Sequence, residues 1–156
     1  MSISTRLKWY LDSHHVEYEL VSHQHTSTSL ESARAAGLPG GRVAKSILLE
    51  DERGYLIVVI PASCRLEIEE IDDQLGRHFD LATENELGDI FKGCEVGAVP
   101  PIGQPFNIPT AIDDCLLRLP DVYFESGDHE ALVHVTGGAF KELMSGAFHG
   151  RISRPH

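Results

Sequence analysis

One lysine of the chain stands among apolar residues, where a functional cation is a natural interpretation. Residues 42–50 are rich in β-branched and aliphatic side chains and predict a strand. Alternate side chains of a strand share a face, so Lys45 falls in one row with Val43, Ile47 and Leu49. Such a lysine is either a functional group of a site, or a residue whose stem covers the core while its ammonium reaches water. The strand by itself leaves both interpretations open.

The segment from Gly97 to Gly103 is the second candidate. Its sequence, G-A-V-P-P-I-G, holds too much glycine and proline for a central strand or a helix. Glycines let the backbone approach a ligand closely and leave N–H groups available to an oxyanion or a nucleotide, and prolines stiffen the loop. The alternative is a tight connection that only turns the chain.

Two histidines form a third set of candidates. His129 lies in the segment Ser126-Gly127-Asp128-His129-Glu130, and His134 lies in the next predicted strand. Each could donate hydrogen bonds or transfer protons near neutral pH. The chain has nine histidines, and a lone histidine is more often a surface residue or a structural one. Both interpretations therefore remain for each of the two.

Several other chemistries lack their motifs. The chain has no G-x-S-x-G elbow and no glycine-rich phosphate loop, which disfavours serine hydrolases, NTPases and dinucleotide enzymes. The three cysteines have no C-x-x-C spacing, and the N-terminal histidines have no H-E-x-x-H spacing. We therefore expect neither a metal nor another cofactor. The residues considered for a metal were Cys64, Cys94, Cys115, His14, His15, His23 and His25.

Composition narrows the class of partner. The 156 residues, 42% hydrophobic and 24% charged, suit one globular domain, 1–156. A net charge of −11 argues against an extended duplex-binding surface, so DNA is not an expected partner. Arg34, Arg42 and Lys45 lie close in sequence and could form a local positive mouth that suits a single-stranded tRNA end. We see neither a membrane-spanning run nor a signal-peptide core, and expect a cytoplasmic protein.

Local sequence patterns predict the helices and strands that position these residues. Helical spacing and capping signals predict helices at residues 4–13, 28–37, 67–75, 84–91 and 138–144. Short β-rich runs predict strands at 16–21, 42–50, 55–60, 111–112, 122–124 and 131–135. Helices and strands do not alternate regularly. We therefore predict an α/β (α+β) fold with a mixed, largely antiparallel sheet or partial barrel and surrounding helices.

The order of these segments resembles the YbaK-type family of aminoacyl-tRNA editing domains, which includes free-standing members and the editing insertion of bacterial prolyl-tRNA synthetases. The resemblance runs from about Ser4 to Met144. The segments that carry it are Val16-Glu17-Tyr18-Glu19, His25-Thr26, Val43-Ala44-Lys45-Ser46-Ile47-Leu48, Gly97-Ala98-Val99-Pro100-Pro101-Ile102-Gly103, Ile112-Asp113 and Ser126-Gly127-Asp128-His129.

This resemblance implies hydrolysis of the ester of a mischarged tRNA. By it, Lys45 binds the terminal phosphate or ribose, Gly97 and Gly103 shape a loop whose N–H groups contact the carbonyl region, and the substrate itself positions the water. The residues it implies for substrate binding are His25, Thr26, Ser46, Pro100, Pro101, Ile102, Asp113, Gly127, His129 and His134. The implied partner is an aminoacyl-tRNA acceptor end, with a synthetase as a further candidate. Two alternatives stay open: a binding module without turnover and an interaction domain with a vestigial pocket.

Overall fold

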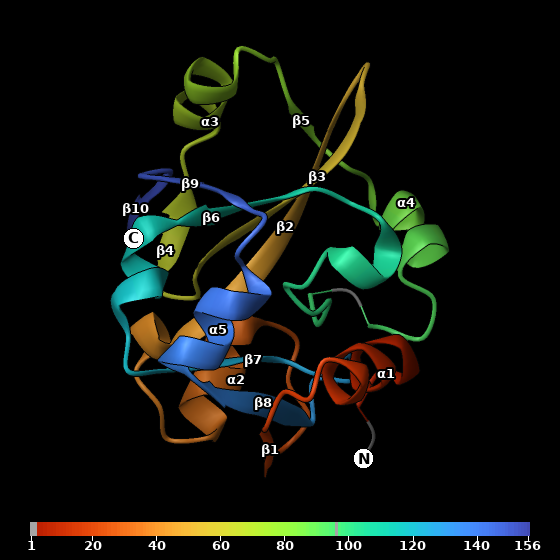
Figure 1. The fold of residues 1–156 in the computed structure, drawn as a ribbon, viewed down its shortest axis with the longest axis vertical. Coiled ribbons are helices and arrows are strands. Elements are labelled where there is room, and N and C mark those ends of the chain that lie inside the picture. Colours follow the sequence, from red (N-terminus) through yellow and green to blue (C-terminus); the bar gives the residue numbers. More distant parts are fainter. Residues whose placement is uncertain (1–2, 96) are drawn as a thin grey trace.

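The fold is built on an eight-stranded mixed sheet, and the computed structural model describes residues 3–95 and 97–156 (Figure 1). In spatial order, the main path of the sheet is β1 (Glu19–Ser22), β8 (Ala131–Thr136), β7 (Asp121–Glu125), β2 (Val43–Asp51), β3 (Gly54–Pro61), β6 (Thr110–Asp113) and β9 (Phe148–Gly150). The pairs β2–β7, β3–β6 and β6–β9 are parallel, and the other pairs are antiparallel. The predicted mixed, largely antiparallel sheet is confirmed.

The longest pairing is the hairpin of β2 and β3, whose tip extends beyond the other strands of the main path (Figure 1). Its register closes at Asp51 opposite Gly54. There the backbone N–H of Arg53 donates to the Asp51 carboxylate at 2.9 Å, and Gly54 has a φ of 131°, which favours glycine. Local turn chemistry thus fixes the register of the strand that bears Lys45.

Five helices surround the sheet in the described part of the chain: α1 (Thr5–Ser13), α2 (Ser29–Ala35), α3 (Ile68–Leu75), α4 (Glu84–Ile90) and α5 (Gly137–Leu143). Their ends follow the predicted signals. Thr28 caps α2 by accepting a hydrogen bond from the Glu31 N–H at 3.1 Å, and Gly37 follows that helix with a φ of 72°. Glu31 bonds the N–H of Ser27 rather than that of Thr28, so the predicted capping box is only half formed.

Packing divides the core between the two faces of β2. Ala44 and Leu48 belong to the main cluster, which contains Leu7 and Leu11 of α1 and Phe140 of α5. Other apolar residues of β2 face away from it: Leu49 packs with Ile71 of α3, and Val43 with Ala33 of α2. The strand is therefore buried on both sides along much of its length, as its near-continuous apolar sequence requires.

Although both faces of β2 are buried, one of its hydrogen-bonding edges is open. On the side away from β3, β2 pairs with β7 only at Val43 and Ala44, and with β5 (Asp80–Leu81) only at Leu49 and Glu50. Within the described residues, positions 45–48 therefore have a strand partner on one side alone. This gap is what gives the middle of β2 access to a ligand.

Four short strands were not predicted from the sequence. They are β4 (Cys64–Leu66), β5, β9 and β10 (Ser153–Pro155), and β4 pairs with β10 in a separate two-stranded sheet. Over the residues that the structure describes, we find no helix that combines the length and the apolar character needed to cross a membrane.

Candidate functional site

A cavity of about 260 Å³ lies at the open edge of β2, and we call it the β2 cleft. Its wall combines Ser46, Ile47 and Leu48 of β2 with Leu87 of α4 and with Gly97 and Val99 of the glycine–proline loop. Most of the lining is aliphatic, which suits an apolar group of a ligand. The structure thus brings together the two segments that the sequence singled out, although they lie about 50 residues apart in the chain.

Ser46 is the polar residue of β2 in this cleft. Its hydroxyl donates to the Val99 carbonyl at 2.6 Å and so fastens the loop to the strand. The Val43 carbonyl accepts from Ala62 on the β3 side, and backbone direction alternates along an antiparallel strand, so the N–H and C=O of Ser46 face the open edge. Backbone groups at such an edge can bind an extended or carbonyl-bearing ligand.

Lys45 is half-buried in the predicted row, on the face opposite to Ser46. Its Nζ lies 3.5 Å from the carbonyl oxygen of Ala62, and burial lowers its pKa while the neighbouring Cys64 opposes that shift. Lys45 does not line the β2 cleft. Ile47, on the same face, does, and two residues of strand separate them by about 7 Å. Lys45 thus lies outside the cleft, two positions along the strand from a residue that lines it.

The loop itself is held by close backbone contacts. Gly97 has a φ of 81°, and a Cβ there would stand 3.0 Å from the Ser27 carbonyl oxygen. A Cβ on Gly103 would clash with the Ile108 carbonyl oxygen and lie 2.6 Å from Thr110 Oγ1. Glycine is therefore required at both predicted positions for steric reasons.

Three other loop residues expected to bind substrate are buried instead. Pro100 and Pro101 are buried, and Ile102 is fully buried in the main core cluster. They anchor the loop from beneath rather than lining the cleft. Val96, which precedes Gly97, lies outside the described residues.

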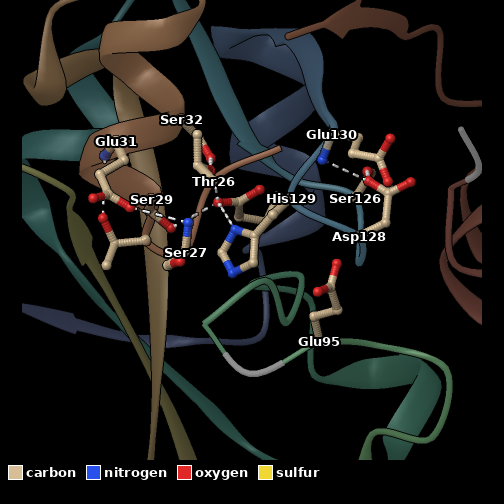
Figure 2. Close-up of polar contacts among 12 residues, drawn as sticks. Thr26, Ser27, Ser29, Glu31, Ser32, Glu95, Ser126, Asp128, His129 and Glu130 are labelled. Carbon is tan, nitrogen blue, oxygen red and sulfur yellow. Dashed lines mark hydrogen bonds and ion pairs between the residues drawn. The ribbon is translucent and has the colours of Figure 1, made fainter. Parts of the chain in front are cut away.

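A buried polar cluster adjoins the loop, and Figure 2 shows its imidazole, that of His129, between the segment of Thr26 to Ser32 and the loop that carries Glu95. The His129 Nδ1 lies 3.1 Å from Glu125 Oε2. The same oxygen accepts hydrogen bonds from Ser29 at 3.2 Å and from Ser32 at 3.0 Å. Thr26 is joined to the cluster because its Oγ1 lies 2.7 Å from Ser32 Oγ. Two predicted residues, Thr26 and His129, thus meet at one network.

Glu125, Ser29 and Ser32 were not predicted as site residues. The two serines are three positions apart on one face of α2, and Glu125 ends a strand that begins with Asp121. Neither pattern is specific in a sequence, because serines on a helix and a glutamate at a strand end are ordinary surface residues. Only the packing of α2 against β7 shows that all three are buried.

His25 and Gly127 border the cluster on the outside. The exposed His25 Nε2 donates to Glu95 at 3.0 Å, and its ring meets that of His129 edge-on with centroids 6.1 Å apart. Gly127, with a φ of 126°, accepts a hydrogen bond from the Glu95 N–H at 2.7 Å through its carbonyl. Both residues therefore contact the start of the loop, through Glu95.

Two predicted residues lie away from the β2 cleft. His134 stacks on Tyr123 with centroids 4.3 Å apart and lines a different cavity, with Glu17 and Glu19. The buried Asp113 accepts from the N–H of Ile152 and from the N–H and hydroxyl of Ser153, at 2.7–3.0 Å. These contacts make Asp113 an anchor for the C-terminal segment, and neither residue lines the cleft.

Asp113→Ala is expected to lower the free energy of unfolding by about 3 kcal/mol at pH 7, because it leaves several buried donors without their charged acceptor. Burial opposes ionisation, yet hydrogen bonds from Cys115, Ser153 and Ile152 hold the pKa of Asp113 below its ordinary value. The contribution is therefore complete above the ordinary carboxyl pKa and is lost as pH falls through the folded one. Urea titrations at pH 7 and pH 3 should show the deficit shrinking in acid. Asp114→Ala is the control, and equal stability of Asp113→Ala and wild type would contradict the assignment.

No three His, Cys, Asp or Glu side chains of residues 3–95 and 97–156 gather closely enough to hold a metal ion. The residues around the β2 cleft and the 97–103 loop can supply hydrogen-bond donors, an ammonium and an imidazole.

Comparison with known proteins identifies the family. The model of the aminoacyl-tRNA editing domain matches residues 23–143. The chain is similar to the hypothetical protein APE2540, with 28% identity, a TM-score of 0.84 and coverage of 96% of this chain and 99% of that one. It is also similar to a candidate trans-editing enzyme for prolyl tRNA synthetase, with 27% identity, a TM-score of 0.81 and coverage of 97% and 96%. The match holds Lys45, the loop and the His129 cluster, and the chain belongs to the aminoacyl-tRNA editing domain family.

Proposed function

We propose that the chain is a trans-editing aminoacyl-tRNA deacylase, which hydrolyses the ester between a wrongly attached amino acid and the 3′ end of tRNA. Its family and its similarity to a candidate trans-editing enzyme support tRNA editing in general. The observation that carries the specific activity is the β2 cleft, where an apolar cavity meets an open strand edge, with the half-buried Lys45 on the same strand but outside the lining.

Each part of the site has a role in this proposal. The aliphatic wall around Leu87 receives the side chain of the amino acid. The backbone at Ser46 and Gly97 faces the ester carbonyl, where N–H groups stabilise the developing oxyanion. Lys45, about 7 Å along the strand from Ile47, binds the terminal phosphate or ribose. Held in this way, the ester needs no protein nucleophile.

Hydrolysis then proceeds by addition of water to the ester carbonyl carbon. The tetrahedral intermediate expels the ribose oxygen, which takes up a proton, and the products are a free amino acid and uncharged tRNA. Positioning and electrostatic stabilisation provide most of the acceleration. The family resemblance assigns the placing of the water to the substrate, including a hydroxyl of its terminal ribose.

The acidity of the chain bears on how the substrate arrives. The chain carries a net charge of −11. A chain with this excess of acidic residues repels the tRNA body. We therefore infer that only the acceptor end is bound and that a synthetase delivers it, with the protein acting in the cytoplasm.

The test is a panel of tRNAs, each esterified with one radiolabelled amino acid, spanning small apolar, small polar and large side chains. The protein is expected to release at least one amino acid with an apolar side chain well above the spontaneous rate, because the lining of the cleft is mostly aliphatic. Release of acid-soluble label over time measures this. Binding of a charged tRNA without any release would instead identify a module that recognises the acceptor end, and would end the deacylase proposal.

A further inference from the structure

A buried carboxylate beside the candidate site is not used by the proposed reaction. Glu125 is 1% exposed, and its Oε2 oxygen accepts hydrogen bonds from Ser29 and Ser32 and faces the His129 Nδ1. Its other oxygen, Oε1, is buried and has no hydrogen-bond partner among the described residues. Keeping an ionised carboxylate in such a place is costly. Its presence calls for a physical reason beyond joining α2 to β7.

Joining the two elements does not require a charge. Ser29 and Ser32 each have one hydroxyl hydrogen to donate, and a neutral acceptor would satisfy both. Thr26 donates in turn to Ser32, because the hydrogen of Ser32 is already directed to Glu125. The contact to the imidazole also gains from a full negative charge, since a hydrogen bond to an ionised acceptor is about twice as strong as a neutral one.

The same contact determines the tautomer of His129. An ionised carboxylate only accepts, so Nδ1 carries a proton and donates to Glu125. His129 is 1% exposed and has a φ of 57°, and its imidazole is enclosed by protein. Nε2 is then directed to the loop: a Cβ added to Gly97 would lie 3.2 Å from it. The carboxylate thus bonds the imidazole, and the imidazole lies beside the backbone of Gly97, which lines the β2 cleft.

We propose that Glu125 is a positioning residue of the editing site. It acts through the imidazole of His129 to hold the backbone of Gly97 in its place in the wall of the β2 cleft. The expected loss of rate rests on the proposed deacylase activity, whereas the structural link from Glu125 through His129 to Gly97 does not. Glu125 touches no substrate. It sets the place of the backbone that faces the ester carbonyl, much as partners of metal-bound histidines set the ligand's orientation.

Two substitutions separate this role from simple packing. Glu125→Gln keeps the shape and a neutral acceptor but removes the charge. His129→Asn keeps a donor for Glu125, and asparagine tolerates the left-handed backbone, but it removes the ring that reaches Gly97. Glu130→Gln, exposed and on the same turn, is the matched control. Both test variants are expected to lower kcat for deacylation by about 10–100-fold, with a smaller change in KM, by analogy with partners that orient metal-bound histidines.

Nuclear magnetic resonance of the full chain gives a readout that does not depend on activity. The wild-type ring is expected to show the proton on Nδ1, and the Gly97 amide resonance should move in Glu125→Gln and in His129→Asn but not in Glu130→Gln. A Gly97 resonance unchanged in the test variants, or a wild-type proton on Nε2, would overturn the link. If Glu125→Gln does not fold, the Gly97 resonance of His129→Asn decides whether the imidazole holds the loop.

The kinetic and spectroscopic results distinguish loss of the positioning role from loss of the proposed deacylase activity. If both variants retain the wild-type kcat while Lys45→Met loses activity, the deacylase stands and the positioning role falls. If wild type hydrolyses none of the charged tRNAs, the deacylase falls, and the Gly97 resonance alone decides whether Glu125 holds the loop.

Discussion

Lys45→Met is expected to reduce kcat/KM for ester hydrolysis by about 10²–10³-fold, the loss typical of removing one group that stabilises a transition state. Methionine keeps the aliphatic stem in the apolar row and removes only the ammonium. The effect is large because burial removes part of the hydration of this cation, as the lowered pKa of Lys45 indicates. A partly desolvated charge interacts more strongly with a phosphate or ribose oxygen than an exposed one.

Stability should change little or improve in the same variant, since a half-buried charge that has no ion pair among the described residues is costly to keep. Steady-state deacylation and thermal unfolding measured on one preparation separate the two effects. Lys141→Met, on the exposed face of α5, is the matched control and should leave both unchanged. Full activity in Lys45→Met would remove Lys45 from the mechanism, whereas Lys45→Arg is expected to restore only part of the rate, because its planar fork places the charge differently.

Gly103→Ala should lower the free energy of unfolding by about 1–3 kcal/mol or more, as for overpacking of a tight core. The φ of Gly103 is −81°, which alanine adopts freely, so the cost is steric alone. The added Cβ meets the Ile108 carbonyl oxygen, a backbone atom that cannot rotate away, and also Thr110 Oγ1 at 2.6 Å. The 97–103 loop must move, and hydrolysis should fall with it.

Gly88→Ala provides a matched control from α4, because a Cβ at Gly88 meets nothing within 4 Å. It should stabilise the protein by about 0.5–1 kcal/mol through helix propensity. Denaturant titrations of the two variants therefore ought to move in opposite directions from wild type. Equal stability of Gly103→Ala and wild type would show that the loop is loosely packed, contrary to the contacts described.

Local signals in the sequence predicted much of the fold. The threonine before α2, the glycine after it and the turn at residues 51–54 act over a few residues, so their chemistry is legible without the rest of the chain. The row that places Lys45 among apolar residues follows from strand period alone. The short strands β4, β5, β9 and β10 were missed because two or three residues show no period.

The candidate site was predicted in part for the same reason. Lys45 and the 97–103 loop were found because an unexpected residue type and an unusual composition are visible locally. The sequence did not indicate that Pro100, Pro101 and Ile102 are buried, or that Asp113 anchors the C-terminal segment. Those outcomes depend on what packs over each residue.

Tertiary structure alone decided where the site opens and what supports it. The β2 cleft exists because β7 and β5 pair with β2 at its two ends and leave residues 45–48 uncovered. Glu125 meets Ser29 and Ser32 across 93 or more positions of sequence. Long-range pairing and burial depend on how distant segments meet, and no spacing along a single chain encodes them, whereas caps, turns and strand faces arise from neighbouring residues.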